Sequence, residues 1–125
     1  MTSTASFPFR YGALRPLLVV LGMGPGLSHV QLDADTLRVR MGWAFRAAIP
    51  VNHITAVQPR SGPVGGIGVH GWRGRWLVNG TTTGLVALSV DPGVRAWATG
   101  VPVQLRELTL SLEDPDALVA GLSAA

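Results

Sequence analysis

The chain contains no cysteine and no lysine, and charged residues make up only 14% of its 125 residues. The lack of cysteine excludes disulfides, thiolate metal sites and thiol nucleophiles, and it fits a reducing compartment. All ten basic residues are therefore arginine, a bias for which a GC-rich coding sequence is the simplest cause. Apolar residues make up 47% of the chain, which argues against a disordered protein, and the length is that of one domain with one core.

No apolar run is long enough to cross a membrane. The best candidate, Leu17–Met23, falls far short of the roughly 20 residues that a spanning helix needs. No A-x-A-like cleavage site follows it, so we expect a cytoplasmic rather than a secreted protein, with a peripheral contact at the inner face of the membrane as the alternative. Because Pro16 and the run Gly24-Pro25-Gly26 bracket this segment, it is expected to form a buried strand or a short packed segment. Residues 1–27 are thus an apolar N-terminal extension to a domain of residues 28–125.

Charge is distributed unevenly along the chain. Residues 1–75 hold eight arginines and all three histidines against two acids, Asp33 and Asp35, whereas residues 76–125 hold two arginines and five acids. Such an asymmetry attracts an anionic partner to the basic part, although it also arises by chance among so few charged residues.

Apolar and polar residues alternate with period two from Ser28 onward, which is typical of half-buried strands. The first three strands are expected at 28–32, 36–41 and 44–49, with turns between them. A fourth strand should end at Pro59, and residues 60–71, which are rich in glycine, should form a loop. Further strands are expected at 75–79 and 85–90, followed by a turn at Asp91-Pro92-Gly93 and by a seventh strand that ends at Leu112 with Thr109 and Ser111 facing solvent.

The last segment, EDPDALVAGL, has the pattern of a short amphipathic helix. The carboxylate of Asp114 suits the N-cap, where it accepts hydrogen bonds from the first turn. Pro115 suits the first helical position, which needs no N–H donor. One apolar stripe is expected to pack on the strands, and it consists of Leu118, Val119 and Leu122.

The glycines Gly66, Gly68 and Gly71 have the G-x-G-x-x-G spacing of a dinucleotide-binding loop. Such a loop needs a helix N-terminus after it to hold the pyrophosphate. Here a strand pattern, WRGRWLVNG, follows instead, so we interpret the glycines as a turn-forming loop and not as a nucleotide site. Trp72 and Trp76 are four residues apart and would face the same side of one strand.

Seven strands followed by a C-terminal helix resemble the bacterial pleckstrin-homology-like (PH-like) domains. The resemblance covers about Ser28 to Leu122 and is carried by the stretches VQLDADTLRVRMGWAFRAAIP, VNHITAVQP and LTLSLEDPDALVAGL. It implies a mainly β fold, a seven-stranded partly open barrel of two packed antiparallel sheets with one C-terminal α-helix. It also implies a binding or assembly module without catalysis. Eukaryotic relatives that hold phosphoinositides carry a basic motif at the first hairpin loop, whereas this loop is acidic, Asp33-Ala34-Asp35.

Catalytic and metal-binding motifs are absent from the sequence. It has no H-E-x-x-H and no G-x-S-x-G motif, and its paired carboxylates are explained by turns and helix capping. We therefore expect neither an enzyme nor a cofactor. A protein partner or self-association is the leading expectation, an anionic ligand or membrane surface is the alternative, and nucleic acid is disfavoured by a net charge of only +3. The segment HGWRGRW supplies weaker candidate residues for such contacts: His70, Trp72, Arg73 and Arg75.

The hairpin around Gly42-Trp43-Ala44 supplies the main candidate site. A three-residue loop sets Met41 against Phe45, so that both apolar faces coincide, whereas a two-residue loop would mix core and solvent positions. The three-residue loop also places Arg40 opposite Arg46, and the preceding hairpin places His29 opposite Arg40. The sequence therefore predicts that three side chains form one outward row across three strands: His29, Arg40 and Arg46. Arg38 should lie beside this row. Together these residues are a candidate site for an anion or a partner. The alternative is that these arginines only extend into water.

Overall fold

The structure is a computed structural model that describes residues 5–60 and 68–123. Within these residues the chain is mainly β, with one mixed sheet of nine strands and a C-terminal helix. The strands are β1 (Ala5–Ser6), β2 (Ser28–Leu32), β3 (Thr36–Met41), β4 (Phe45–Pro50), β5 (Ile54–Arg60), β6 (Gly68–Trp72), β7 (Arg75–Asn79), β8 (Leu85–Ala98) and β9 (Val101–Ser111). The helices are α1 (Arg15–Val20) and α2 (Pro115–Ser123), with short 3-10 turns η1 (Pro25–Leu27) and η2 (Val51–His53).

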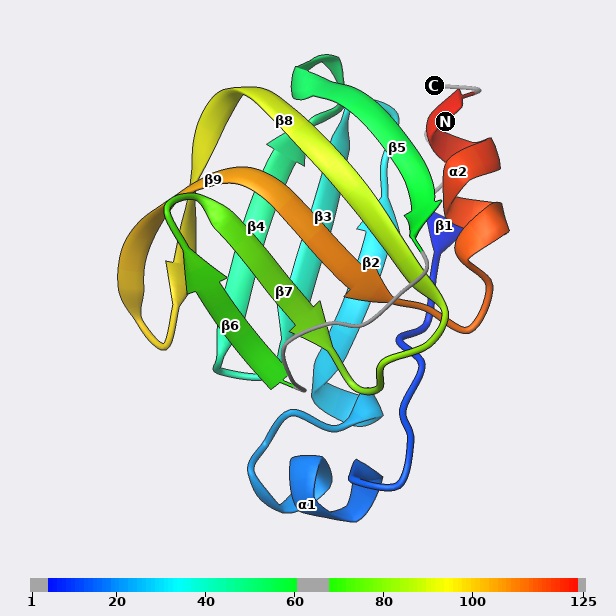
Figure 1. The fold of residues 1–125 in the computed structure, drawn as a ribbon, viewed down its shortest axis with the longest axis vertical. Coiled ribbons are helices and arrows are strands. Elements are labelled where there is room, and N and C mark those ends of the chain that lie inside the picture. The colour runs from blue at the N-terminus through cyan, green and yellow to red at the C-terminus, as the bar shows by residue number, and fades with distance from the viewer. Residues whose placement is uncertain (1–4, 61–67, 124–125) are drawn as a thin grey trace.

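The sheet has the order β1-β2-β3-β4-β8-β9-β7-β6, and β5 pairs with β8 beside this path. In Figure 1, β5, β8, β9 and β7 pass in front of β2, β3 and β4, and buried side chains from both groups form one core. The seven expected strands are all present, and β1 and β6 are additional. The sheet is not closed into a barrel, and it is not antiparallel throughout, because β7 runs parallel to β9.

The register predicted for β2, β3 and β4 is confirmed. Met41 pairs with Phe45 and Leu37 with Ile49 across the three-residue turn, and Leu32 pairs with Leu37 across the preceding one. Every inward side chain of β3 and β4 is buried. The apolar alternation selects this register because a shift by one residue would turn the apolar set to solvent.

Two strands continue through prolines that were expected to end them. β8 runs through Asp91-Pro92-Gly93, and its pairing with β9 shifts between Ser89 and Val94. The predicted turn is therefore wrong, because a bulge absorbs the extra residues within the strand. β5 runs through Pro59 to Arg60. Proline is tolerated there because β5 pairs only with β8 and is an edge strand.

The N-terminal segment is part of the same core. Phe7 and Phe9 are buried, and the backbone N–H of Phe7 donates to the Val30 carbonyl at 2.7 Å. The expectation that Thr109 and Ser111 face solvent is wrong, since both are buried. The reason is that neighbours cover them. The Ser111 hydroxyl bridges the N-terminal segment to Gly80, and Thr109 Oγ1 accepts from the guanidinium of Arg60 at 3.2 Å.

The two helices differ in how far they are buried. The prediction for α2 is confirmed, because the Ala117 N–H donates to Asp114 Oδ1 at 3.2 Å and both Leu118 and Leu122 are buried. Of the two alternatives for Leu17–Met23, the buried strand is wrong, and the short packed segment holds in part, because Leu18 and Met23 are buried. That segment lies in and just after helix α1, most of whose apolar side chains are exposed.

Candidate anion-binding site

One row of side chains crosses four strands on the outer face of the sheet. His29 on β2 pairs with Arg40 on β3, and Arg40 pairs with Arg46 on β4, as the sequence predicts. Arg46 pairs in turn with Trp97 on β8. The row arises because these residues occupy the outward positions of strands whose inward positions form the core. The structure therefore brings together His29, Arg40 and Arg46, with Arg38 two residues from Arg40 on the same face.

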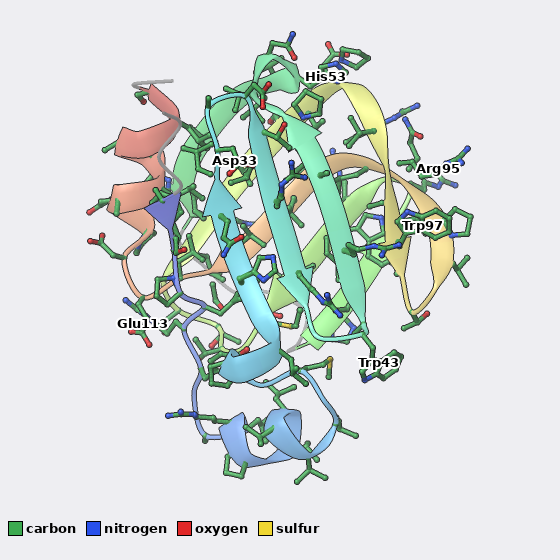
Figure 2. All side chains as sticks on the ribbon, turned by 180° about the vertical axis from the view of Figure 1, so that it is seen from behind. Asp33, Trp43, His53, Arg95, Trp97 and Glu113 are labelled. Atoms are coloured by element: carbon green, nitrogen blue, oxygen red, sulfur yellow. The ribbon has the colours of Figure 1, made fainter. Side chains whose placement is uncertain are left out.

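A hollow of about 320 Å³ lies beside this row. Arg95 on β8 joins Arg38, Arg40 and Arg46 in its lining, so that four arginine residues contribute to one depression. Its remaining lining consists of His29, Val39, Ala47, Ala48 and Trp97. Figure 2 looks onto this face and shows Arg95 and Trp97 side by side on β8. We call this group of residues the arginine hollow.

The hollow has a local structural cause. Ala48 occupies an outward position on β4 opposite Arg38, and its short side chain leaves space among the longer side chains that line the hollow. The pairing of β4 with β8 also stops after Ala47 and Ala96. Beyond that point the two strands are no longer paired.

Three of the four arginines have a contact that orients them. Arg38 Nε lies 3.1 Å from Asp33 Oδ2 in an exposed ion pair, Arg40 Nε donates to the Gly42 carbonyl at 3.1 Å, and Arg46 Cζ lies 5.8 Å from the centroid of the Trp97 ring. A cation at this distance from an indole ring is attracted by the ring quadrupole. The contact of Arg40 uses Nε and does not involve the terminal nitrogens.

The electrostatics of the hollow favour an anion. Arg40 faces Arg46 directly, and like charges in such cross-strand pairs are unfavourable by about 0.2–1 kcal/mol. Among the described residues the lining itself contains no carboxylate, and Asp33 offsets the charge of Arg38 alone. Guanidinium groups keep their charge at every physiological pH and match phosphate and carboxylate oxygens in bidentate geometry. The arrangement can therefore hold a phosphate or carboxylate group.

The weaker candidate binding residues from the segment HGWRGRW lie elsewhere, on the β6–β7 hairpin. Arg73 is in its turn, and Arg75 Nε lies 3.4 Å from Glu107 Oε2 on β9. His70 pairs with Leu77 in the register of the hairpin, and the side chain of Trp72 is outside the described part of the structure. Of the candidates whose side chains the structure describes, His70, Arg73 and Arg75 do not line the arginine hollow.

The same hairpin bears on whether the G-x-G-x-x-G motif forms a dinucleotide-binding loop. Gly68 and Gly71 lie in β6, and β7 follows instead of a helix, while Gly66 lies outside the described residues. Gly71 pairs with Trp76, whose ring contacts the position where a Cβ would stand. The expectation that Trp72 and Trp76 share one strand is wrong, because they belong to the two arms of the hairpin.

Sequence reasoning missed two lining residues, Arg95 and Trp97. Their signal was present, since Val94, Ala96 and Ala98 alternate with them in period two. The expected turn at Asp91-Pro92-Gly93 hid this alternation, because it ended the strand before these residues.

Other kinds of site find less support in the described part of the chain. There, no three histidine or acidic side chains come together as a group that could hold a metal. None of the described helices has the length and apolar character needed to span a bilayer.

The chain matches no protein-family model, and neither a curated protein nor a solved structure is detectably similar to it.

Proposed function

We propose that this chain is a non-enzymatic binding module of the PH-like class, and that its arginine hollow holds an anionic group carried by a partner. The observation that carries the proposal is that four arginines line one depression, with Arg40 and Arg46 directly opposite each other and, among the described residues, only Arg38 paired with an acid, Asp33. The order of strands followed by a C-terminal helix supports the PH-like class. The parallel pairing of β7 with β9 and the additional strand β6 are departures from the barrel that the resemblance implies.

The positions of the arginines suit an anion better than a purely solvated surface. Arg40 and Arg46 face each other at a cross-strand pair, and Trp97 and the Gly42 carbonyl orient them. An anion between the two guanidiniums removes the repulsion and accepts charge-assisted hydrogen bonds, which are the stronger kind. Because all four arginines are exposed, binding is expected to weaken as salt is added.

Calorimetric titration with inorganic pyrophosphate tests this proposal. The double substitution Arg40→Gln and Arg46→Gln should weaken binding by about tenfold or more, since a single charge-assisted hydrogen bond contributes about 1.5–3 kcal/mol. The matched control is Arg75→Gln with Arg106→Gln, which removes the same charge from exposed positions outside the hollow. Equal loss of binding in both double variants would show that net charge alone attracts the anion, and the proposal would fail.

A second copy of the chain is an alternative source of the anion. Glu113, Asp114 and Asp116 are all exposed around the start of α2, so this acidic segment is accessible to the arginine hollow of another molecule. Sedimentation of the parent at low and high salt distinguishes this case. A larger mass at low salt, lost in the Arg40→Gln and Arg46→Gln variant, would identify self-assembly.

A further inference from the structure

Exposed apolar side chains gather at one end of the molecule. Eight large apolar residues in the described part of the chain are exposed, and seven of them lie in or beside α1, in η1, or in the β3–β4 turn. Figure 1 shows α1 at one end of the molecule, beyond the strands, and Figure 2 shows Trp43 toward that same end. We call these seven residues the apolar end: Leu14, Leu17, Val19, Val20, Leu21, Leu27 and Trp43. A concentration of this kind marks a contact surface more often than scattered exposed residues do.

The apolar end is held in place by specific contacts. Helix α1 ends in a Schellman motif, in which the Met23 N–H donates to Leu18 O at 2.8 Å and Gly22 has a φ of +79°. Leu18 and Met23 are buried and anchor the helix. Trp43 Nε1 donates to the Leu21 carbonyl at 2.6 Å, which ties the β3–β4 turn to the end of α1. The exposed side chains therefore project from a fixed backbone.

The surroundings of the apolar end are cationic. Residues 5–32 contain no acidic residue, and Arg15 lies in the first turn of α1 itself. The arginine hollow is also close, because Arg40 precedes Trp43 by three residues, which places their Cα atoms at most about 11 Å apart. The acids Asp33 and Asp35 lie in the β2–β3 turn, at the other end of these strands.

We infer that the apolar end lies against the surface of an anionic lipid bilayer, with the arginine hollow taking lipid phosphate groups. This inference rests on the proposed function and names the source of its anion. Exposed leucine and valine side chains gain by leaving water at the boundary of headgroups and acyl chains, and tryptophan favours that boundary. With Trp43 at this boundary, Arg40 lies close to the headgroup layer and can contact its phosphates.

The charges argue against a second copy as the occupant. In an isologous contact through the apolar end, each subunit would bring Arg15 toward the same interface. The segment of residues 5–32 offers no acid to pair with it. An anionic bilayer supplies the missing negative charge, whereas this isologous contact between two copies does not.

Vesicle sedimentation tests the inference, with phosphatidylcholine vesicles and with equal mixtures of phosphatidylcholine and phosphatidylglycerol. The parent should bind the mixed vesicles and bind the neutral ones much less. The double substitution Leu17→Ser and Val20→Ser changes side chains that are 51% and 83% exposed, so it should leave the fold intact. It should weaken binding to mixed vesicles by about tenfold or more and leave the affinity for inorganic pyrophosphate unchanged.

Two further double variants separate the contribution of the arginine hollow to binding from the effect of net charge. Arg40→Gln with Arg46→Gln should lose both vesicle and pyrophosphate binding, whereas Arg75→Gln with Arg106→Gln should keep both. Vesicles should also shift the tryptophan emission of the parent to shorter wavelength, and Trp43→Phe should abolish most of that shift.

The possible outcomes distinguish this inference from the proposed function. If the parent binds pyrophosphate but not mixed vesicles, the inference fails and the proposed function stands. If it binds vesicles without binding pyrophosphate, and loss of Arg40 and Arg46 has no effect, the proposed function fails together with the headgroup role of the hollow. If Leu17→Ser with Val20→Ser converts an oligomer to a monomer and the parent ignores vesicles, the apolar end is a contact between copies and the inference is overturned.

Discussion

Tyr11 links the N-terminal segment to the end of helix α1. Its hydroxyl donates to the Met23 carbonyl at 2.8 Å, and that carbonyl also accepts from the Ser28 hydroxyl at 3.2 Å. Burial raises the pKa of Tyr11 above its ordinary value of 10.0, and the Ser28 side chain and the charge of Arg15 partly offset this effect. A single residue thus couples the position of the apolar end to a titration that is easy to observe.

The free energy of unfolding should fall as pH rises above 10. A raised pKa means that the unfolded chain releases the phenolic proton first, so the stabilisation is complete below about pH 10 and declines as pH rises through the folded-state pKa. Tyr11 is the only tyrosine, and the chain has no lysine or cysteine, so no other side chain titrates between about pH 9 and 11. Urea unfolding over this range measures the effect.

Tyr11→Phe is the matched control for this titration. It should lower the free energy of unfolding by about 1 kcal/mol at neutral pH, the usual contribution of one hydrogen bond. It should also remove the decline above pH 10. An equal decline in the parent and in the variant would show that another group is responsible.

At the level of elements, the predictions from sequence succeeded where contacts are local. Strands β2, β3 and β4 join through short turns, and the apolar alternation allows only one register. Helix α2 carries its own capping signals in Asp114 and Pro115. The signals of α1 were present as well, in Pro16 at its first turn and Gly22 after its end, but its apolar character favoured the interpretation as a buried segment.

The predictions failed where a distant partner decides the structure. A proline and a glycine within β8 are typical of a turn, and only the shifted pairing with β9 keeps them in a strand. The parallel pairing of β7 with β9 joins segments far apart in sequence, so no local pattern indicates it. The candidate site was consequently predicted for β2, β3 and β4, whereas Arg95 and Trp97 on β8 were missed.

Helix α2 should be necessary for folding. Leu118 is fully buried, and Leu118→Asp places a carboxylate without a partner in the core, which should lower the free energy of unfolding by more than about 3 kcal/mol. Near-UV dichroism and urea unfolding measure the loss. Ala120→Asp is the control, because Ala120 is exposed on the same helix. If Leu118→Asp melts like this control, α2 does not belong to the core.

On the scale of the whole molecule, two different surfaces lie close together: the arginine hollow and the apolar end. The arginine hollow lies on the outer face of β3, β4 and β8, and the apolar end lies beyond the β3–β4 turn. Both depend on the same three-residue turn, because Gly42 accepts from Arg40 while Trp43 donates to Leu21. A partner with negative charge above an apolar layer fits both surfaces at once. Neither surface alone would indicate such a partner.

Added salt should change the stability of the free molecule. If no anion is bound, the positive charges of the arginine hollow repel each other, and this repulsion lowers the free energy of unfolding. Added sodium chloride should screen the repulsion. Arg40→Gln removes the pair with Arg46 while leaving the contact of Arg46 with Trp97. The stability of the parent relative to this variant should therefore rise with sodium chloride, by up to about 0.2–1 kcal/mol.

Replacing chloride by phosphate at constant ionic strength should favour the parent further, because a ligand of the folded state stabilises it. Urea unfolding in both salts measures these differences, with Arg106→Gln as the control for the loss of one exposed charge. If Arg40→Gln and Arg106→Gln respond alike to both salts, the arginines of the hollow only extend into water and hold no anion.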